Sequence, residues 1–421
     1  MSTRIQNFVG RRHYTDVDAC ASRVLGFAMR NRESAPLWAR AMVIVLAVAA
    51  LRWPAAAQVA APILVAVRPI APPAVGLPEE SSSAGETRFS FIAYGDARSQ
   101  VDGRALQPDH EVVVDTMVAK IKALASTPFP VKFVLQTGDA VSNGTNGAAW
   151  NVSYSPLIER ITRGAGVPYF LTAGNHDVAF APDSRPLGLH NMLTAFSRLT
   201  PPEGSPRRLS GYPTFAFGYG HLFAIAIDSN VAADPVQLAW VTDQIEHLDR
   251  SRYRQVIAFF HHPPFSSGPH GGVAPGPAVT TDDNVERQTA AIRTLYAPMF
   301  RRFHVRMTLT GHDHLYDHWI ERYTDAAGSY RRDDVVTGGG GAPIYTYRGE
   351  PDVRVYLTAG AGDKVRLEHP MRPGMTAAEN PHHFVVVQVD GDRLSLEVVG
   401  TGPTRYTPYG DRSGIELNDP N

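Results

Sequence analysis

The sequence predicts a layered α/β fold built as one large domain. Short β-rich segments alternate with segments whose apolar residues recur at helical spacing, from about residue 89 to residue 303. After Thr310 the pattern changes to strands separated by Gly-rich turns. Alternating strands and helices followed by a strand-rich end are typical of stacked sheets and helices.

The elements follow from local patterns along the chain. The segment 89–94 is β-rich and ends at Gly-Asp. A helix is expected over 109–125, where Val112, Val113, Met117 and Ile121 recur at helical spacing. The later expected elements are strand 131–136, helix 150–163, strands 167–172, 214–219 and 221–228, helix 235–248, strand 255–260, helix 284–303, and strands 305–309, 384–389 and 393–399.

Composition excludes several classes of function. The chain has 421 residues, and 40 Lys and Arg balance 41 Asp and Glu, so no overall basic field favours nucleic acid. The single cysteine excludes an internal disulfide and a cysteine-based zinc site. Any metal would be held by His, Asp, Asn or Glu, and the 16 histidines are a generous supply.

Residues 1–57 read as an N-terminal region with a signal peptide. The apolar run 41–51 is too short for a spanning helix, which needs ~20 residues. Arginines precede it and the small-residue pattern 54–58 follows it, as at a cleavage site. A start at Met29 gives a signal of ordinary length. We expect export to the periplasm or the medium, with a mature chain from Gln58; the alternative is a membrane anchor through residues 41–57.

The remaining chain divides by composition. Residues 58–86 are rich in Pro, Ala and Ser and are expected to form a linker. The main domain is expected over 87–401, with a C-terminal tail over 402–421.

Polar residues gather directly after five of the predicted strands. Because the carboxyl ends of strands in α/β sheets converge on one crevice, these motifs are expected to meet in space. The motifs are Gly95-Asp96-Ala97-Arg98, Gly138-Asp139, Gly174-Asn175-His176-Asp177, His261-His262-Pro263 and Gly311-His312-Asp313-His314.

This mixed nitrogen and oxygen set suits Zn, Mn, Fe or Co better than Mg or Ca. It holds too many ligands for one tetrahedral ion with an open position. It is sufficient for two ions about 3.5–4 Å apart.

The complete ordered series resembles the calcineurin-like metallophosphoesterase family, which includes enzymes related to purple acid phosphatases. The resemblance runs from about residue 89 to residue 399. It implies a four-layer α/β/β/α sandwich with a dinuclear site at one edge of the paired sheets. It also implies the metal ligands: Asp96 and His314 on the first ion, Asn175, His261 and His312 on the second, and Asp139 on both.

The same resemblance implies an exported phosphoesterase that cleaves phosphate mono- or diesters by attack of a metal-bound hydroxide. His176 would contact the phosphate or protonate the leaving oxygen, with Asp177 orienting its ring. Arg98 could hold the phosphate through two parallel hydrogen bonds. Many family members carry Asp-x-His in the first motif, so the first ion lacks one imidazole here.

Several questions stay open from sequence. The alternative function is a catalytically weak phosphate- or metal-binding protein on the same scaffold, motivated by the missing histidine. The expected partner is a small phosphoester, with no nucleic acid and no stable membrane span after signal cleavage. Outside the ligand set, His262 and Asp313 are expected to support the ligands or to be structural. His318 is expected to be exposed or half-buried, and His382-His383 a surface pair.

Overall fold

The computed structural model describes residues 65–98, 107–178, 183–272 and 285–418. They belong to one compact unit that spans 64–421. The expected signal region, residues 1–57, lies outside the described residues. Within those ranges, no helix combines the length and the apolar character needed to cross a membrane.

The first sheet has six strands in the order β13-β12-β11-β1-β2-β3. Its β1, β2 and β3 run parallel, whereas β11, β12 and β13 join by antiparallel pairing. The strands are β1 (Arg88–Tyr94), β2 (Val131–Gln136), β3 (Tyr169–Leu171), β11 (His383–Asp390), β12 (Arg393–Gly400) and β13 (Gly414–Glu416).

The second sheet has seven strands in the order β10-β8-β9-β7-β6-β5-β4. Parallel pairing joins β5, β6, β7 and β9, and antiparallel strands complete both edges. The strands are β4 (Phe215–Tyr219), β5 (Leu222–Ala226), β6 (Gln255–Phe259), β7 (Met307–Thr310), β8 (Tyr316–Thr324), β9 (Ser329–Thr337) and β10 (Arg366–Met371).

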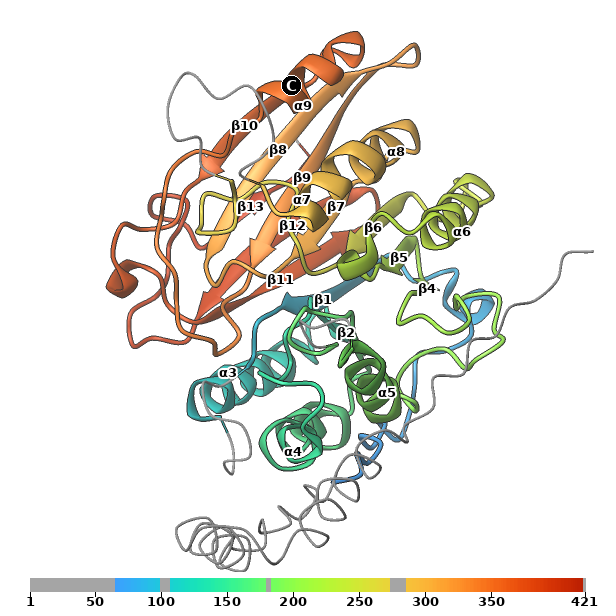
Figure 1. Cartoon of the computed structure of the whole chain (residues 1–421), viewed down its shortest axis with the longest axis vertical. Helices are drawn as coiled ribbons and strands as arrows, with labels where there is room; N and C mark the ends of the chain where they lie inside the picture. The colour runs from blue at the N-terminus through green and yellow to red at the C-terminus, as the bar shows by residue number, and fades with distance from the viewer. Residues whose placement is uncertain (1–64, 99–106, 179–182, 273–284, 419–421) are drawn as a thin grey trace, which may run out of the picture. The chain divides into compact units, whose positions relative to one another are not determined.

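Helices cover the outer face of each sheet (Figure 1). Those on the first sheet are α3 (Pro108–Leu124), the π-helical turn η2 (Ala149–Tyr154), α4 (Ser155–Glu159), the π-helical turn η3 (Arg160–Ala165) and α5 (Arg185–Ala195). Those on the second are α6 (Pro235–Glu246), α7 (Arg287–Ala291), the π-helical turn η6 (Ile292–Tyr296) and α8 (Ala297–Arg302). The short elements are η1 (Glu80–Ser83), η4 (Ser229–Val231), α9 (Arg354–Ala359), η7 (Ala361–Asp363) and η8 (Ala377–Glu379).

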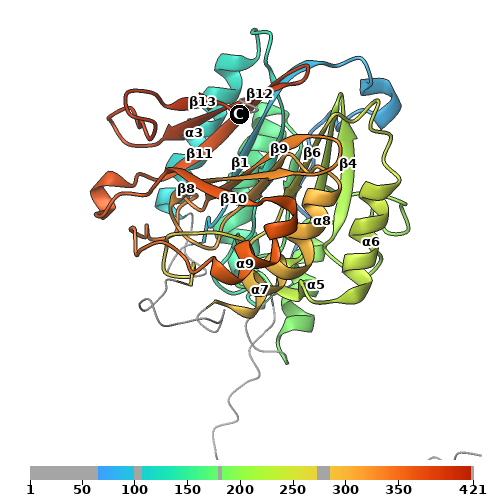
Figure 2. The ribbon, with the colours of Figure 1, turned by 90° about the horizontal axis from the view of Figure 1, so that it is seen from above.

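The apolar core follows the strand period. In β1, Ile92 and Tyr94 join the cluster under α3 and α4, whereas Phe91 and Ala93 join the cluster between the sheets. Successive side chains of a strand point to opposite faces, so β1 is buried on both. The inter-sheet cluster takes side chains from both sheets, and a third cluster includes residues of β5, β6, α6 and α8. Figure 2 shows α6 and α8 along the second sheet. The predicted α/β class is therefore confirmed, and the clusters are those of a helix–sheet–sheet–helix arrangement.

The expected linker differs from the structure over its described part. Ile70 is fully buried, and the backbone N–H of Ala71 donates to Glu159. Glu80 accepts hydrogen bonds from Arg207 and Tyr253. A Pro-rich composition predicts extended backbone correctly. An extended segment can still pack along a domain when apolar residues such as Ile70 are buried against it.

The expected tail also belongs to the domain. Residues 414–416 form β13 and pair with β12, and Leu417 is buried between the sheets. Three strand residues are too few for a period-2 pattern to be read from sequence.

Two histidine expectations were wrong. His318 on β8 is fully buried and lies 2.8 Å from both Asp333 Oδ1 and Tyr409 Oη. His383 is also buried, whereas its neighbour His382 is half-buried. Both ring nitrogens of His318 have protein partners, which offsets the cost of burying the ring. For His383, Nδ1 lies 3.0 Å from the Pro381 carbonyl oxygen, whereas the buried Nε2 has no hydrogen-bond partner among the described residues.

Candidate metal centre

The predicted ligands lie in loops that follow β1, β2, β3, β6 and β7. Three of them have left-handed backbone, with φ of +59° at Asp96, +56° at Asp139 and +69° at His312. This conformation is strained for residues other than glycine and persists only where the surroundings hold it, which is common at functional sites. The sharp reversals turn each short side chain toward a shared centre.

Glycines permit the close approach of these loops. A Cβ added at Gly174 would lie 2.1 Å from the Asp139 backbone nitrogen, and one at Gly311 would lie 2.3 Å from Asp96 Oδ2. Any side chain at either position would displace a predicted ligand.

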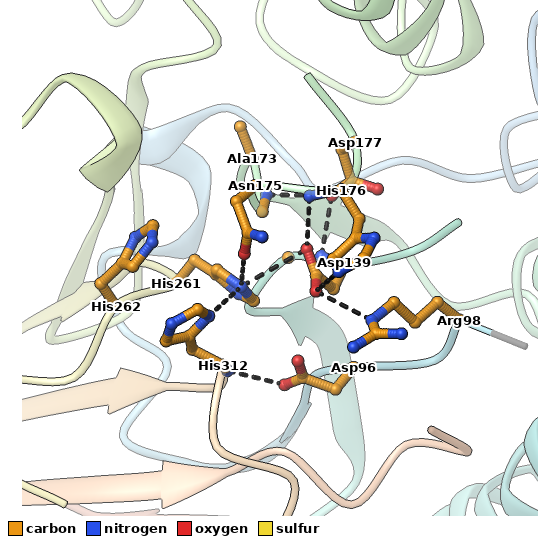
Figure 3. Close-up of polar contacts among 12 residues, drawn as sticks. Asp96, Arg98, Asp139, Ala173, Asn175, His176, Asp177, His261, His262 and His312 are labelled. Atoms are coloured by element: carbon orange, nitrogen blue, oxygen red, sulfur yellow. Dashed lines mark hydrogen bonds and ion pairs between the residues drawn. The ribbon is translucent and has the colours of Figure 1, made fainter. Parts of the chain in front are cut away.

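Three predicted ligands converge on Nε2 of a fourth, His261 (Figure 3). This atom lies 2.9 Å from Asn175 Oδ1, 3.1 Å from His312 Nδ1 and 3.4 Å from Asp139 Oδ1. These are the ligands expected for the second ion. A shared cation would bring two ring nitrogens and two oxygens close together in this way.

The ligands expected for the first ion form an adjacent group. The ligand atoms of Asp96, Asp139 and His314 all lie within 4.8 Å of one another. Asp96 Oδ1 is 3.5 Å from His314 Nε2, and it is a buried oxygen with no hydrogen-bond partner among the described residues. An unpaired buried carboxylate oxygen is costly, and a cation bound there would remove that cost.

Arg98 extends into the same group. Its Nε donates to Asp139 Oδ2 at 3.2 Å, and its Nη2 lies 3.3 Å from His314 Nε2. The guanidinium therefore contacts two side chains that are expected to hold the first ion. It also lines a pocket of about 380 Å³ at the site, as a phosphate-binding role requires.

The two imidazoles of His261 and His314 present bare nitrogens to the site. His261 Nδ1 lies 3.0 Å from the Thr137 carbonyl oxygen, and His314 Nδ1 lies 2.7 Å from the Pro343 carbonyl oxygen. A carbonyl only accepts, so each Nδ1 carries the hydrogen and each Nε2 keeps its lone pair. A neutral imidazole of this kind is the form that binds a metal.

Burial sets the charge states. It lowers the pKa of both His261 and His314 to about 3, so both rings are neutral near pH 7. Burial and the charge of Asp139 raise the pKa of Asp96 well above its usual value. Burial would also raise the pKa of Asp139, but His261, His176 and Arg98 together lower it.

The catalytic pair is arranged differently from the expectation. His176 Nε2 lies 3.8 Å from Asp139 Oδ2, and His176 Nδ1 lies 2.8 Å from the Ser142 carbonyl oxygen. Asp177 accepts instead from four backbone N–H groups, those of Asp139, Ala140, Val141 and Gly174. These contacts favour the Ser142 carbonyl, rather than Asp177, as the group that orients the His176 ring. Asp177 fixes the loop that carries Asp139.

The pocket also contains residues that sequence reasoning missed. Glu286, His270 and Tyr345 line it beside the predicted residues. Glu286 Oε1 lies 2.8 Å from His270 Nδ1, and this hydrogen bond raises the pKa of His270. Glu286 and His270 do not stand in any of the five motifs that follow predicted strands, so those motifs could not reveal them.

His262 and Asp313, expected to support the ligands or to be structural, lie beside the site. Asp313 accepts from Ser266 Oγ and from the His270 backbone, so it holds the loop that follows His262. His262 lines the pocket, and its Nδ1 lies 2.8 Å from Ser229 Oγ. Together with Glu286 and His312 it forms a second group whose ligand atoms lie within 4.8 Å of one another.

Comparison with known proteins finds sequence similarity to phosphoesterases. Residues 113–316 match the family model described as calcineurin-like phosphoesterase, a range that includes every predicted site residue except Asp96 and Arg98. Purple acid phosphatase 1 of Ipomoea batatas is 24% identical over 165 residues, which cover 38% of this chain and 30% of that protein.

A solved structure shares the fold. The purple acid phosphatase isolated from yellow lupin (Lupinus luteus) seeds superposes with a TM-score of 0.51 at 14% identity, covering 77% of this chain and 53% of that one. This chain therefore spans about half or less of the length of these two relatives.

Proposed function

Residues 113–316 belong to the calcineurin-like phosphoesterase family, and from this premise we propose that the chain hydrolyses phosphoric esters at a site for two metal ions. Mn, Zn or Fe suits the mixed ligand set. The substrate is a small phosphate mono- or diester.

One observation carries this proposal. Six side chains from five separate loops converge with their ligand atoms turned inward: Asp96, Asp139, Asn175, His261, His312 and His314. An unpaired carboxylate oxygen and two neutral imidazoles with inward lone pairs suit cations and have no evident structural purpose.

Bound ions of this kind acidify a water and neutralise charge on a phosphoryl group. The chain's own residues would do the rest. Arg98 would hold a phosphate oxygen at the pocket wall. His176, oriented by the Ser142 carbonyl, would deliver a proton to the leaving oxygen. No side chain is needed as a covalent nucleophile.

The test is a parallel assay of the purified protein with Mn, Zn or Fe supplied. An aryl monophosphate, a bis-aryl phosphate, a cyclic nucleotide and phytate would be compared, with Asp139→Ala as the inactive reference. Metal-dependent turnover of at least one substrate, lost in Asp139→Ala, supports the proposal. Turnover that survives in Asp139→Ala would exclude this site.

A second function is favoured by one contact. The Arg98 guanidinium touches Asp139 and His314, where the first ion is expected. If it stays there, the protein holds a single ion beside a fixed cation and acts as a phosphate- or metal-binding protein. Arg98→His, which restores the Asp-x-His pattern, would then add an ion and turnover.

We also propose that the protein is exported after cleavage near Gln58. The apolar run 41–51 and the small residues after it support this. N-terminal sequencing of the protein recovered from the periplasm or medium should begin near Gln58. A chain that retains residues 1–57 in the membrane fraction would support the anchor instead.

A further inference from the structure

Glu286 contacts one of the predicted metal ligands directly. It stands at the start of α7, and its Oε2 lies 2.8 Å from His312 Nε2. Its other oxygen lies 2.8 Å from His270 Nδ1. One carboxylate thus joins a predicted ligand to the loop that forms one side of the pocket.

This contact determines which nitrogen of His312 faces the site. A carboxylate accepts hydrogen bonds, so the hydrogen of the neutral ring is held on Nε2 and the lone pair is left on Nδ1. His312 Nδ1 is the atom that lies 3.1 Å from His261 Nε2, within the group expected to hold the second ion.

His312 differs in this respect from the other two histidines of the ligand set. The hydrogens of His261 and His314 are held by backbone carbonyls, those of Thr137 and Pro343. His312 depends on a side chain, and its own backbone is left-handed. Its ring orientation can therefore be lost by one substitution.

We propose that Glu286 is a positioning residue that fixes the tautomer and orientation of His312 and so sets the affinity of the second metal position. The inference rests on the proposed function. Partners that orient metal-binding imidazoles are worth about 10–100-fold in metal affinity.

The rival reading makes Glu286 a direct ligand. Its carboxylate, His262 and His312 have ligand atoms within 4.8 Å of one another and could together hold a separate ion. A neutral imidazole has one lone pair, and Nδ1 of His312 is the nitrogen that lies 3.1 Å from His261 Nε2, in the group expected to hold the second ion. Nε2 then carries the hydrogen, which Glu286 Oε2 accepts at 2.8 Å. The geometry therefore points to a hydrogen-bond partner of His312.

The test compares Glu286→Ala and Glu286→Gln with the wild type in the full chain. Alanine removes the acceptor, whereas glutamine keeps one acceptor oxygen without the charge. Asp325→Asn is the matched control, because Asp325 Oδ2 lies 2.7 Å from His304 Nε2 in a similar pair away from the site.

Two readouts are needed. The first is ¹⁵N NMR of the metal-free protein, with the His312 signal assigned by its loss in His312→Gln. The Nε2–H tautomer should dominate in the wild type and in Asp325→Asn, and a mixture should appear in Glu286→Ala. The second is titration of the metal-free protein with Zn, in which one of two sites should weaken 10–100-fold in Glu286→Ala and less in Glu286→Gln.

An unchanged tautomer or unchanged Zn affinity in Glu286→Ala overturns the proposal. A third ion in the wild type that is lost in both variants also overturns it, since Glu286 would then be a ligand. Circular dichroism and thermal unfolding show whether each variant is folded. If the wild type binds no ions, the proposed function fails, and the tautomer signal still decides whether Glu286 holds His312.

Discussion

Replacing Gly174 by alanine adds one methyl group at the closest approach of two ligand loops. The new Cβ would lie 2.1 Å from the Asp139 backbone nitrogen and 2.2 Å from Asp139 Oδ1. Favourable van der Waals contacts between heavy atoms begin at about 3.5 Å, so Asp139 must move by about 1 Å or more. No nearby flexible side-chain end can absorb this, because the atoms met belong to the backbone and to the ligand itself.

Two magnitudes follow. A displacement of about 1 Å in a reacting group costs about 10²-fold in rate, and overpacking a dense region costs about 1–3 kcal/mol of unfolding free energy. We expect kcat/KM for an aryl phosphate to fall by about 10²-fold, with a modest fall in Tm. Gly362→Ala is the control, because nothing lies within 4 Å of its added Cβ. Wild-type turnover and Tm in Gly174→Ala would refute the described approach of the two loops.

Three further substitutions distinguish a residue that acts in the reaction from residues that stabilise the fold. His176→Ala should lower turnover by about 10²–10⁴-fold at unchanged Tm, and wild-type turnover would contradict a proton-transfer role. Asp177→Ala should lower the unfolding free energy by at least about 3 kcal/mol, because four backbone amides lose their acceptor; an unchanged Tm would contradict this. Burial would raise the pKa of Asp333, but the His318 hydrogen bond and the charges of Arg306 and Arg331 hold it below its usual value. The stabilisation that ionised Asp333 adds to the free energy of unfolding is therefore complete above about pH 4, near the pKa of an unfolded Asp. It is lost as the pH falls through the lowered pKa of the folded state. Asp333→Asn should cost about 3–5 kcal/mol in urea unfolding at pH 6, with a smaller deficit at pH 3; an equal deficit at both values would contradict this.

The ligand loops were predictable because their signal is local. A glycine beside a short polar residue at the end of a β-rich run, as in Gly138-Asp139, predicts both a sharp turn and the sheet edge that it faces. Several element positions were predictable from local residue pattern, and β1, β2 and β6 lie within one residue of expectation, whereas α5 and β13 were not predicted.

The remaining features depend on tertiary contacts. Glu286 at the N-cap of α7 contacts His312, which is distant in sequence, and no local pattern marks it. Asp177 follows the residue that it was expected to orient, yet the fold directs its carboxylate to backbone amides. Residues 65–86 lack a helical or strand period, so their packing depends on single buried side chains such as Ile70.

The central claim is that this chain binds two ions and that both are needed for hydrolysis. The most direct measurement is metal content per chain, with aryl phosphate turnover followed in the same sample as the metal-free protein is titrated. We expect two ions per chain, with turnover appearing as the second position fills. Saturation at one ion or none, without turnover, would contradict it and would leave Arg98 as the permanent cation of a binding protein.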